Sequence, residues 1–196
     1  MTKLLSSANP TPTALRWWLL ALLLVCPLFF CPGGKGAEEG SKEHQIKAAF
    51  LYNFTKFVVW PEPRPGSPGD AFVMGVLGRN PFGNELEKVV RGRMVGGRKL
   101  LVKYLSSVSE ATTVDLLFVA EGEESRLGPS MKSLHSHSVL TVGESSRFEA
   151  LGGIITFSTL QDKIRFGINR QEGQAAGLKI SPQLLKLAIP ARSGNP

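Results

Sequence analysis

Cysteine is nearly absent from this sequence, which contains only Cys26 and Cys31 among its 196 residues. Both lie in an apolar N-terminal segment, so residues 38–196 contain no cysteine and can form no disulfide. A domain of this length buries about 68–70% of the surface of its unfolded chain, which allows a core without cross-links. Val25 and Phe30 precede the two cysteines, where a lipid-attachment signal has small residues, so lipid modification is disfavoured.

A hydrophobic run long enough to cross a membrane is also missing. The run Trp17–Phe30 has 14 residues and follows the basic residues Lys3 and Arg16. A membrane-spanning helix needs about 20 apolar residues, whereas the core of a secretory signal peptide has roughly 7–15. Small residues suited to cleavage follow the run, at Gly33, Gly34, Gly36 and Ala37.

This pattern predicts a signal peptide over residues 1–37, a single domain over residues 38–196, and therefore a periplasmic protein. An uncleaved membrane anchor is the alternative. Pro27 and Pro32 argue against it, because proline inside a spanning helix removes a backbone hydrogen bond.

Positive charge is present but not concentrated. The chain has a net charge of +7, and its basic residues are scattered apart from a cluster at Arg91, Arg93, Arg98 and Lys99. Binding of nucleic acid needs a concentrated basic face with aromatic platforms. We therefore interpret the cluster as a solvated turn and expect no nucleic-acid partner.

Fingerprints of catalysis and of cofactor binding are missing as well. No GxGxxG follows a strand, and the sequence has no GxxxxGK[ST], no GxSxG and no HExxH. The acidic residues Glu121, Glu123 and Glu124 suit the positive end of a helix dipole rather than paired catalytic carboxylates. We therefore expect neither an enzyme nor a cofactor.

The three histidines are the remaining candidates for a metal site. His135 and His137 would point the same way if they lay on a strand, and His44 lies in another element. No other ligand pattern supports zinc or copper, so we interpret them as polar loop residues and expect no metal.

Hydrophobic periodicity predicts an alternation of strands and helices. A helix over residues 41–60 would bury Ile46, Ala49, Phe50, Asn53, Phe54, Phe57 and Val58. Strands follow at Phe72–Leu77, Leu100–Leu105, Val114–Ala120 and Val139–Val142. Between them, Asn80-Pro81 begins a helix that buries Phe82, Leu86, Val89 and Val90; residues 91–97 form a turn; and Leu127, Met131 and Leu134 share a helix face.

The C-terminal part has the clearest local signals. Ile154–Phe157 and Ile164–Ile168 form an antiparallel hairpin across the turn Ser158–Lys163, with Phe166 facing the core. Asn169 then caps a helix that closes at Gly177, and Ser181-Pro182 begins another. The order of elements predicts an α/β fold with a mainly parallel sheet, an antiparallel C-terminal hairpin and helices packed on the sheet.

In a parallel sheet of this kind, ligands bind at the carboxyl ends of the strands. Those ends carry Gly78-Arg79-Asn80 and Glu121-Gly122. An anion could bind at the glycine turn beside Arg79, although a plain strand-to-helix turn has the same signature. The residues predicted to contact a partner or ligand are Arg79, Asn80 and Phe82, and Phe82 also fits the core stripe of its helix.

Several long motifs resemble the YfiR-like family. They are Lys47–Pro61 (KAAFLYNFTKFVVWP), Gly78–Gly83 (GRNPFG), Lys163–Asn169 (KIRFGIN), Ala175–Ser181 (AAGLKIS) and Leu184–Ala188 (LLKLA). Together they place nearly everything after residue 43 within the resemblance.

The resemblance implies a small periplasmic protein of α/β fold without known catalytic residues or a required cofactor. The best-known member of the family represses a membrane-anchored diguanylate cyclase by binding its periplasmic domain. An outer-membrane lipoprotein relieves this repression, and members can associate as dimers. The favoured hypothesis is therefore a periplasmic regulator or sensor that binds the periplasmic domain of an inner-membrane signalling protein. The alternative is a periplasmic small-molecule-binding protein that uses the crevice at Arg79–Phe82.

Overall fold

The computed structural model describes residues 35–62 and 71–190, with side chains from residue 42 onward. The apolar run Trp17–Phe30 lies outside these residues. The sheet and the sites described below belong to the compact unit that begins at Glu38. Within the ranges described, no helix is both long enough and apolar enough to cross a membrane.

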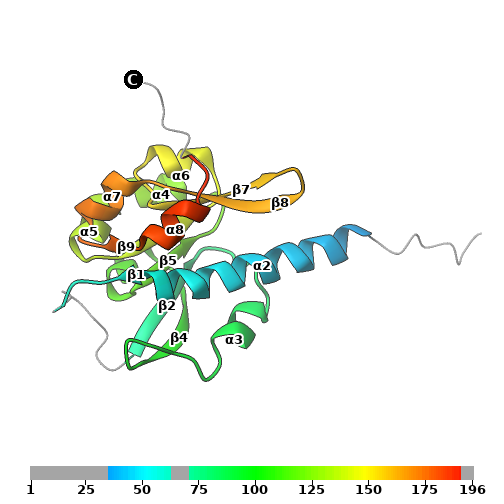
Figure 1. Ribbon diagram of the computed structural model, residues 1–196, viewed down its shortest axis with the longest axis horizontal. Coiled ribbons are helices and arrows are strands. Elements are labelled where there is room, and N and C mark those ends of the chain that lie inside the picture. Colours follow the sequence, from blue (N-terminus) through cyan, green and yellow to red (C-terminus); the bar gives the residue numbers. More distant parts are fainter. Residues whose placement is uncertain (1–34, 63–70, 191–196) are drawn as a thin grey trace, which may run out of the picture. The chain divides into compact units, whose positions relative to one another are not determined.

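A seven-stranded sheet forms the centre of the fold (Figure 1). Five neighbouring strands are parallel, and an antiparallel strand is added at each edge. The predicted α/β class, the mainly parallel sheet and the C-terminal hairpin are therefore confirmed. In spatial order the strands are β3 (Met94–Val95), β4 (Arg98–Leu105), β2 (Ala71–Leu77), β5 (Leu116–Val119), β6 (Leu140–Gly143), β7 (Ile155–Leu160) and β8 (Lys163–Ile168).

Helices cover both faces of the sheet, which explains why β2, β5 and β6 are almost entirely buried. One core contains side chains from α2 (Lys35–Phe57), α3 (Glu85–Val90) and α8 (Pro182–Leu187). The other contains side chains from the 3₁₀ turn η1 (Val108–Thr113) and from α4 (Glu124–Leu127), α5 (Met131–Ser136) and α6 (Ser146–Ala150). The short helix α7 (Arg170–Ala175) packs beside α5.

The prediction for α2 is correct in type but wrong in its ends and in its buried face. The helix begins six residues earlier and ends at Phe57, after which Val58–Val59 form strand β1, paired with β9 (Lys179–Ile180). Ile46 is 46% exposed, whereas Lys47 is only 6% exposed. The buried face is therefore rotated relative to the prediction, because Lys47 finds carboxylate partners that an apolar periodicity cannot reveal.

Both hairpins differ from their predictions in where they turn. Residues 91–97 are predicted as a turn, but Met94–Val95 pair with β4 and only Gly96-Gly97, both at positive φ, connect the strands. In the C-terminal hairpin the connection is Gln161-Asp162, also both at positive φ, so β7 and β8 are longer than predicted. Polar residues extend β4, β7 and β8 beyond their predicted ends, because one face of each hairpin is exposed to solvent.

The helix caps of the C-terminal part are confirmed. The Asn169 side chain accepts a hydrogen bond from Glu172 N (3.1 Å), and the Ser181 side chain accepts one from Leu184 N (3.2 Å). Gly177 has φ of +71°, as expected for a residue that closes a helix. Each of these signals depends on residues within one turn, which is why the sequence predicts them well.

An aromatic cluster joins α2 to the C-terminal hairpin. The ring centroid of Phe54 lies 5.8 Å from that of Phe157 and 5.2 Å from that of Phe166. Phe50 adds contacts to the same two rings at 6.0 and 5.4 Å. Only the first two residues of β7 pair with β6, so the rest of the hairpin projects beyond the parallel strands, as Figure 1 shows. The cluster therefore anchors the projecting part of the hairpin to α2.

Candidate functional site

The carboxyl edge of the sheet is hollow beside α2. A cavity of about 190 Å³ opens between the ends of β5 and β6, the strand β7 and the helix α2. A smaller hollow of about 50 Å³ adjoins it and shares Glu144, Phe157 and Ser158 as lining residues. The larger cavity is lined by Glu43, Lys47, Glu121, Glu144, Ser145, Phe157, Ser158 and Thr159.

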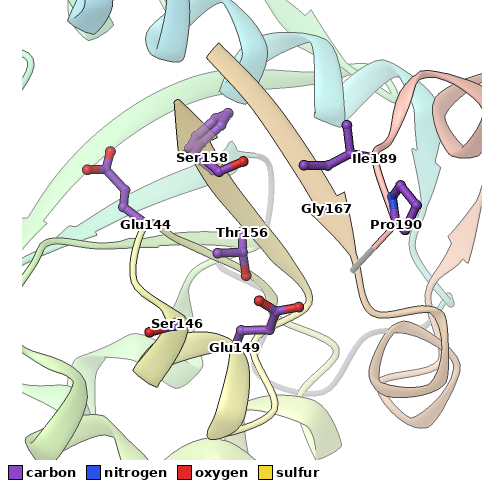
Figure 2. Close-up of a pocket in the computed structure, with 9 residues that line it drawn as sticks. Glu144, Ser146, Glu149, Thr156, Ser158, Gly167, Ile189 and Pro190 are labelled. Carbon is purple, nitrogen blue, oxygen red and sulfur yellow. The ribbon is translucent and has the colours of Figure 1, made fainter. Parts of the chain in front are cut away.

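Figure 2 shows the smaller hollow, in which α6 faces the hairpin. Glu149 of α6 lies close to Thr156 of β7 in this view, while Glu144 extends from the loop after β6. The far side of the hollow is closed by Ile189 and Pro190. Ile189 N donates a hydrogen bond to Phe166 O (2.9 Å), so the chain after α8 is held against the hairpin.

Lys47 is the central polar residue of the larger cavity. Its ammonium lies 2.5 Å from a Glu43 carboxylate oxygen, one helical turn earlier, and 2.9 Å from a Glu144 oxygen. Burial by itself lowers the pKa of Lys47, but the two carboxylates outweigh burial and raise it above its ordinary value. Lys47 is therefore a fixed cation that holds α2 to the loop after β6.

A second polar layer supports the loop. Glu124 is 7% exposed and accepts hydrogen bonds from Ser145 Oγ (2.6 Å) and from Gly122 N (2.9 Å). Burial opposes ionisation of Glu124, but these hydrogen bonds outweigh it and lower the pKa of the carboxyl group. Ser145 Oγ also accepts a hydrogen bond from Phe148 N (3.0 Å), so one hydroxyl caps α6 and connects it to α4.

The lining of the larger cavity is polar and mainly acidic. The lining contains three carboxylates, from Glu43, Glu121 and Glu144, together with Lys47, serine and threonine hydroxyls and the ring of Phe157. Two of the carboxylates, Glu43 and Glu144, pair with Lys47. Such a surface suits a small polar ligand that carries positive charge. No group of three or more metal-ligating side chains in the described part of the chain is arranged to hold a metal ion.

The residues predicted for the site lie at the same edge but outside this cavity. Arg79 is exposed in the loop after β2. The Asn80 side chain accepts a hydrogen bond from Phe82 N (2.8 Å) and donates one to Gly83 O (2.9 Å), so it shapes a turn. The prediction that Asn80-Pro81 begins a helix is wrong, because α3 begins only at Glu85.

Phe82 is 2% exposed, and its ring packs against Phe118 with centroids 4.8 Å apart. Its burial matches the core stripe that the sequence also allows for this residue. The crevice beside Gly78 is filled by Glu123, since a Cβ at Gly78 would lie 2.5 Å from Glu123 Cγ. That carboxylate makes the glycine turn a poor place for an anion.

The three histidines each contact a different group. His135 belongs to α5 and pairs with Glu172 across 3.2 Å, while His137 follows that helix with Nδ1 2.8 Å from Ser133 O. Burial lowers the pKa of His135, and the nearby Glu172 carboxylate opposes this only in part. His44 packs its ring edge-on against Phe82. The strand on which His135 and His137 would point the same way does not exist.

Lys47 and Glu144 are not among the residues that the sequence predicts for the site. The spacing of Glu43 and Lys47, four residues apart on one helix, is a signal that could have identified the pair. Glu144-Ser145 follow β6 just as Glu121-Gly122 follow β5, so the rule about carboxyl ends also applies to them. What the sequence does not show is that α2 closes over this corner.

The amino edge of the sheet carries a different polar cluster. Asp115 is fully buried; its carboxylate accepts hydrogen bonds from Val73 N (2.7 Å) and from the Arg98 guanidinium (3.0 Å). Trp60 Nε1 donates a hydrogen bond to the Asp115 carbonyl (3.1 Å), and Arg98 also donates one to Ala71 O (3.3 Å). These contacts tie β2, β4 and β5 together where the strands begin.

Comparison with known proteins identifies relatives of this chain. A family model described as YfiR/HmsC-like matches residues 44–189. No curated protein matches. One similar solved structure is that of a conserved domain protein from Vibrio cholerae O1 biovar El Tor, with a TM-score of 0.48 and 9% sequence identity over 75% of this chain. The chain spans 59% of that protein's length.

Proposed function

Because the chain belongs to the YfiR/HmsC-like family, we propose that it is a periplasmic regulator that represses a membrane-anchored signalling enzyme, such as a diguanylate cyclase, by binding its periplasmic domain. The observation that carries the proposal is the match over residues 44–189, which includes all the motifs that resemble this family. The proposal includes export by a signal peptide over residues 1–37 and one functional domain over residues 38–196.

Repression of this kind requires no catalytic group in the regulator. A partner that is bound about 100-fold more tightly in its inactive form is shifted towards that form by about 2.7 kcal/mol. A well-packed α/β unit with an exposed recognition loop is sufficient for such selective binding. The proposed activity therefore depends on a surface rather than on a reaction.

The proposed contact surface is the loop from Arg79 to Phe82. Arg79 presents a cation at the carboxyl edge of β2, and arginine is enriched in protein interfaces. Asn80 and Phe82 would act from beneath, because Asn80 holds the turn and the ring of Phe82 anchors it to Phe118. A loop held in this way loses little conformational entropy when a partner binds.

The test is a crosslinking experiment in cells, combined with measurement of cyclic di-GMP. Deletion of the gene should raise cyclic di-GMP and biofilm formation if the partner is a cyclase, and the wild-type protein should crosslink to an inner-membrane protein. The variant Arg79→Glu should raise cyclic di-GMP above its level with the wild-type protein and should reduce the crosslink. Lys132→Glu, an exposed charge reversal on α5, should change neither. Unchanged nucleotide levels together with no captured membrane protein would refute the proposal.

A second candidate function is the binding of a small periplasmic molecule. The cavity around Lys47 supports it, and its three carboxylates favour a cationic ligand over the anion considered at Arg79. Spermidine and arginine are suitable cationic probes, with citrate as an anionic one. A ligand at about 100 times its dissociation constant should stabilise the protein by about 2.7 kcal/mol. If no probe of either charge raises the melting temperature, this second candidate loses its support.

A further inference from the structure

The edge of the sheet at β3 and β4 combines positive charge with exposed aliphatic side chains. Residues Arg91–Lys103, here named the basic hairpin, contain five basic residues and no acidic one. We propose that the basic hairpin docks on the surface of a membrane that contains anionic phospholipids. This activity lies beyond the proposed repression and can be tested without any protein partner.

The register of the hairpin places cations and aliphatic groups on the same face. Met94 pairs directly with Lys99, so their side chains share one face of the sheet. Leu101 and Lys103 follow on β4 at intervals of two residues and therefore lie on that face as well. Met94 is 62% exposed and Leu101 is 40% exposed.

The charges at this edge are only partly neutralised. Arg98 is paired with Asp115, and Lys103 lies 3.3 Å from Glu110. Arg91 and Lys99 form no ion pair with any residue in the described ranges 42–62 and 71–190. Their positive charge is therefore available to a negatively charged surface.

Positive charge also continues on the other side of the hairpin, towards α2. The Arg93 guanidinium lies 5.0 Å from the centre of the Tyr52 ring, and the Lys56 ammonium lies 4.3 Å from the same ring. Cations thus lie on both faces of the sheet at this edge, whereas the exposed aliphatic groups Met94 and Leu101 lie only on the face away from α2. An edge of this kind can enter the head-group layer with its cations among the phosphates.

The composition of this surface favours lipid over a protein partner. Lys99 and Lys103 flank Leu101 on the exposed face of β4, and lysine is depleted from protein interfaces. Arginine and methionine are enriched in such interfaces, so it is these two lysines that favour lipid, rather than Met94 or the arginines of the hairpin. A second copy of the chain would bring the same positive charges together, which disfavours self-association through this edge. Lysine side chains can instead cover apolar contacts while their ammonium groups reach lipid phosphates.

The turns of the hairpin also suit a flat surface. Gly92, Gly96 and Gly97 all have positive φ, and a Cβ placed on any of them would meet no atom within 4 Å. The tip of the hairpin therefore carries no side chain that would hold the backbone away from the head groups. Met94 and Val95 stand directly beside this bare turn.

The expected binding is weak and reversible, as for other peripheral proteins. Each basic residue near an anionic membrane contributes about fivefold in affinity. Removal of three such charges should therefore lower the affinity by about two orders of magnitude, and added salt should have a similar effect.

The test is cosedimentation of the protein with vesicles of phosphatidylethanolamine and phosphatidylglycerol, compared with vesicles of phosphatidylcholine. All variants keep the same N-terminal segment, so any contribution of that segment is common to them. The variant Arg91→Gln/Arg93→Gln/Lys99→Gln should lose about 100-fold in affinity for the anionic vesicles. The control Lys132→Gln/Lys163→Gln/Lys186→Gln removes the same charge from exposed positions elsewhere and should lose less than about fivefold.

A further variant, Met94→Ser, tests the aliphatic contribution and should lower the affinity severalfold at a salt concentration that screens charge. Equal binding to both kinds of vesicle, or equal losses in the hairpin and control variants, would overturn the proposal. If the hairpin variants bind anionic vesicles as the wild type does but lose a crosslink to an acidic protein in cells, the basic hairpin recognises a protein and not a membrane. Because the vesicles contain no signalling enzyme, these results do not depend on whether the chain represses one.

Discussion

The two edges of the parallel sheet each contain an ion pair with one buried member. At the amino edge this pair lies among the strands, whereas at the carboxyl edge it lines a cavity. At the amino edge, the Asp115 carboxylate has no exposed surface and binds a backbone amide and the Arg98 guanidinium, while Trp60 donates a hydrogen bond to the Asp115 carbonyl. At the carboxyl edge, the Lys47 side chain is 7% exposed, and its partners Glu43 and Glu144 keep 39% and 26% of their side-chain surface exposed.

The difference shows that the burial of one charged group does not by itself tell whether the residues around it support the fold or line a binding site. Asp115 satisfies backbone and side-chain donors from neighbouring strands, so its loss would leave those donors unpaired. The partners of Lys47 reach a cavity of about 190 Å³ and can be solvated when the lysine is removed. The amino edge is therefore a structural clamp, whereas the carboxyl edge keeps room for a ligand.

The largest expected effect tests whether the aromatic cluster between α2 and the C-terminal hairpin is part of the core. Phe166 is 3% exposed and packs against Phe54 and Phe50. Phe166→Ala should lower the free energy of unfolding by about 3–5 kcal/mol, since it leaves a cavity in an aromatic cluster. Urea denaturation measures this loss. Lys163→Ala, at an exposed position of the same strand, should change stability by no more than about 0.5 kcal/mol; equal losses would mean that the cluster is not a core.

The next effect is the loss of the clamp at the amino edge. Asp115→Ala should destabilise the protein by about 3 kcal/mol, because Val73 N and the Arg98 guanidinium lose a buried acceptor. We expect the lower end of the usual range, since Arg98 is 26% exposed and can reach water. Thermal unfolding of Asp115→Ala, compared with that of Arg98→Ala, measures this loss of stability. A loss below about 1 kcal/mol would remove the distinction between the edges.

A smaller effect should follow at the carboxyl edge. Lys47→Met keeps the length of the side chain and removes its charge, and both carboxylates become free to bind water in the cavity. The expected loss is about 1 kcal/mol, so Asp115→Ala should cost more than Lys47→Met under the same conditions. The reverse order would show that the Lys47 cluster is the main electrostatic support of the fold.

The smallest effect concerns the dependence of stability on pH at the carboxyl edge. The folded protein lowers the pKa of Glu124 below its ordinary value of 4.5. The ionised carboxylate therefore contributes stability above pH 4.5, and this contribution is lost as the pH falls through the lower folded pKa. The difference in stability between wild type and Glu124→Gln should be about 1 kcal/mol at pH 7 and should shrink towards pH 3. A difference that grows on acidification would contradict this assignment.

The sequence predicts local features far better than the candidate site. Asn169, Ser181 and Gly177 are placed correctly, because a cap or a left-handed residue is decided by its neighbours within one turn. Asn80 shows the limit of such signals, since the same Asx side chain can begin a helix or stabilise a turn. The prediction of the site fails for a related reason: in the sequence, Lys47 looks like any other polar residue of an amphipathic helix.

What the sequence determined by itself is the strands β2, β4, β5 and β6, the C-terminal hairpin with its capped helices, and the motifs that identify the family, since all of these depend on residues close together in the chain. Only the tertiary structure decided where α2 lies, and with it the burial of Lys47 against Glu144 and the pairing of β1 with β9. These contacts join residues about a hundred positions apart. Periodicity along one segment carries no information about the partner that covers it, so the cavity at the carboxyl edge and the exposed basic hairpin emerge only when the layers are assembled.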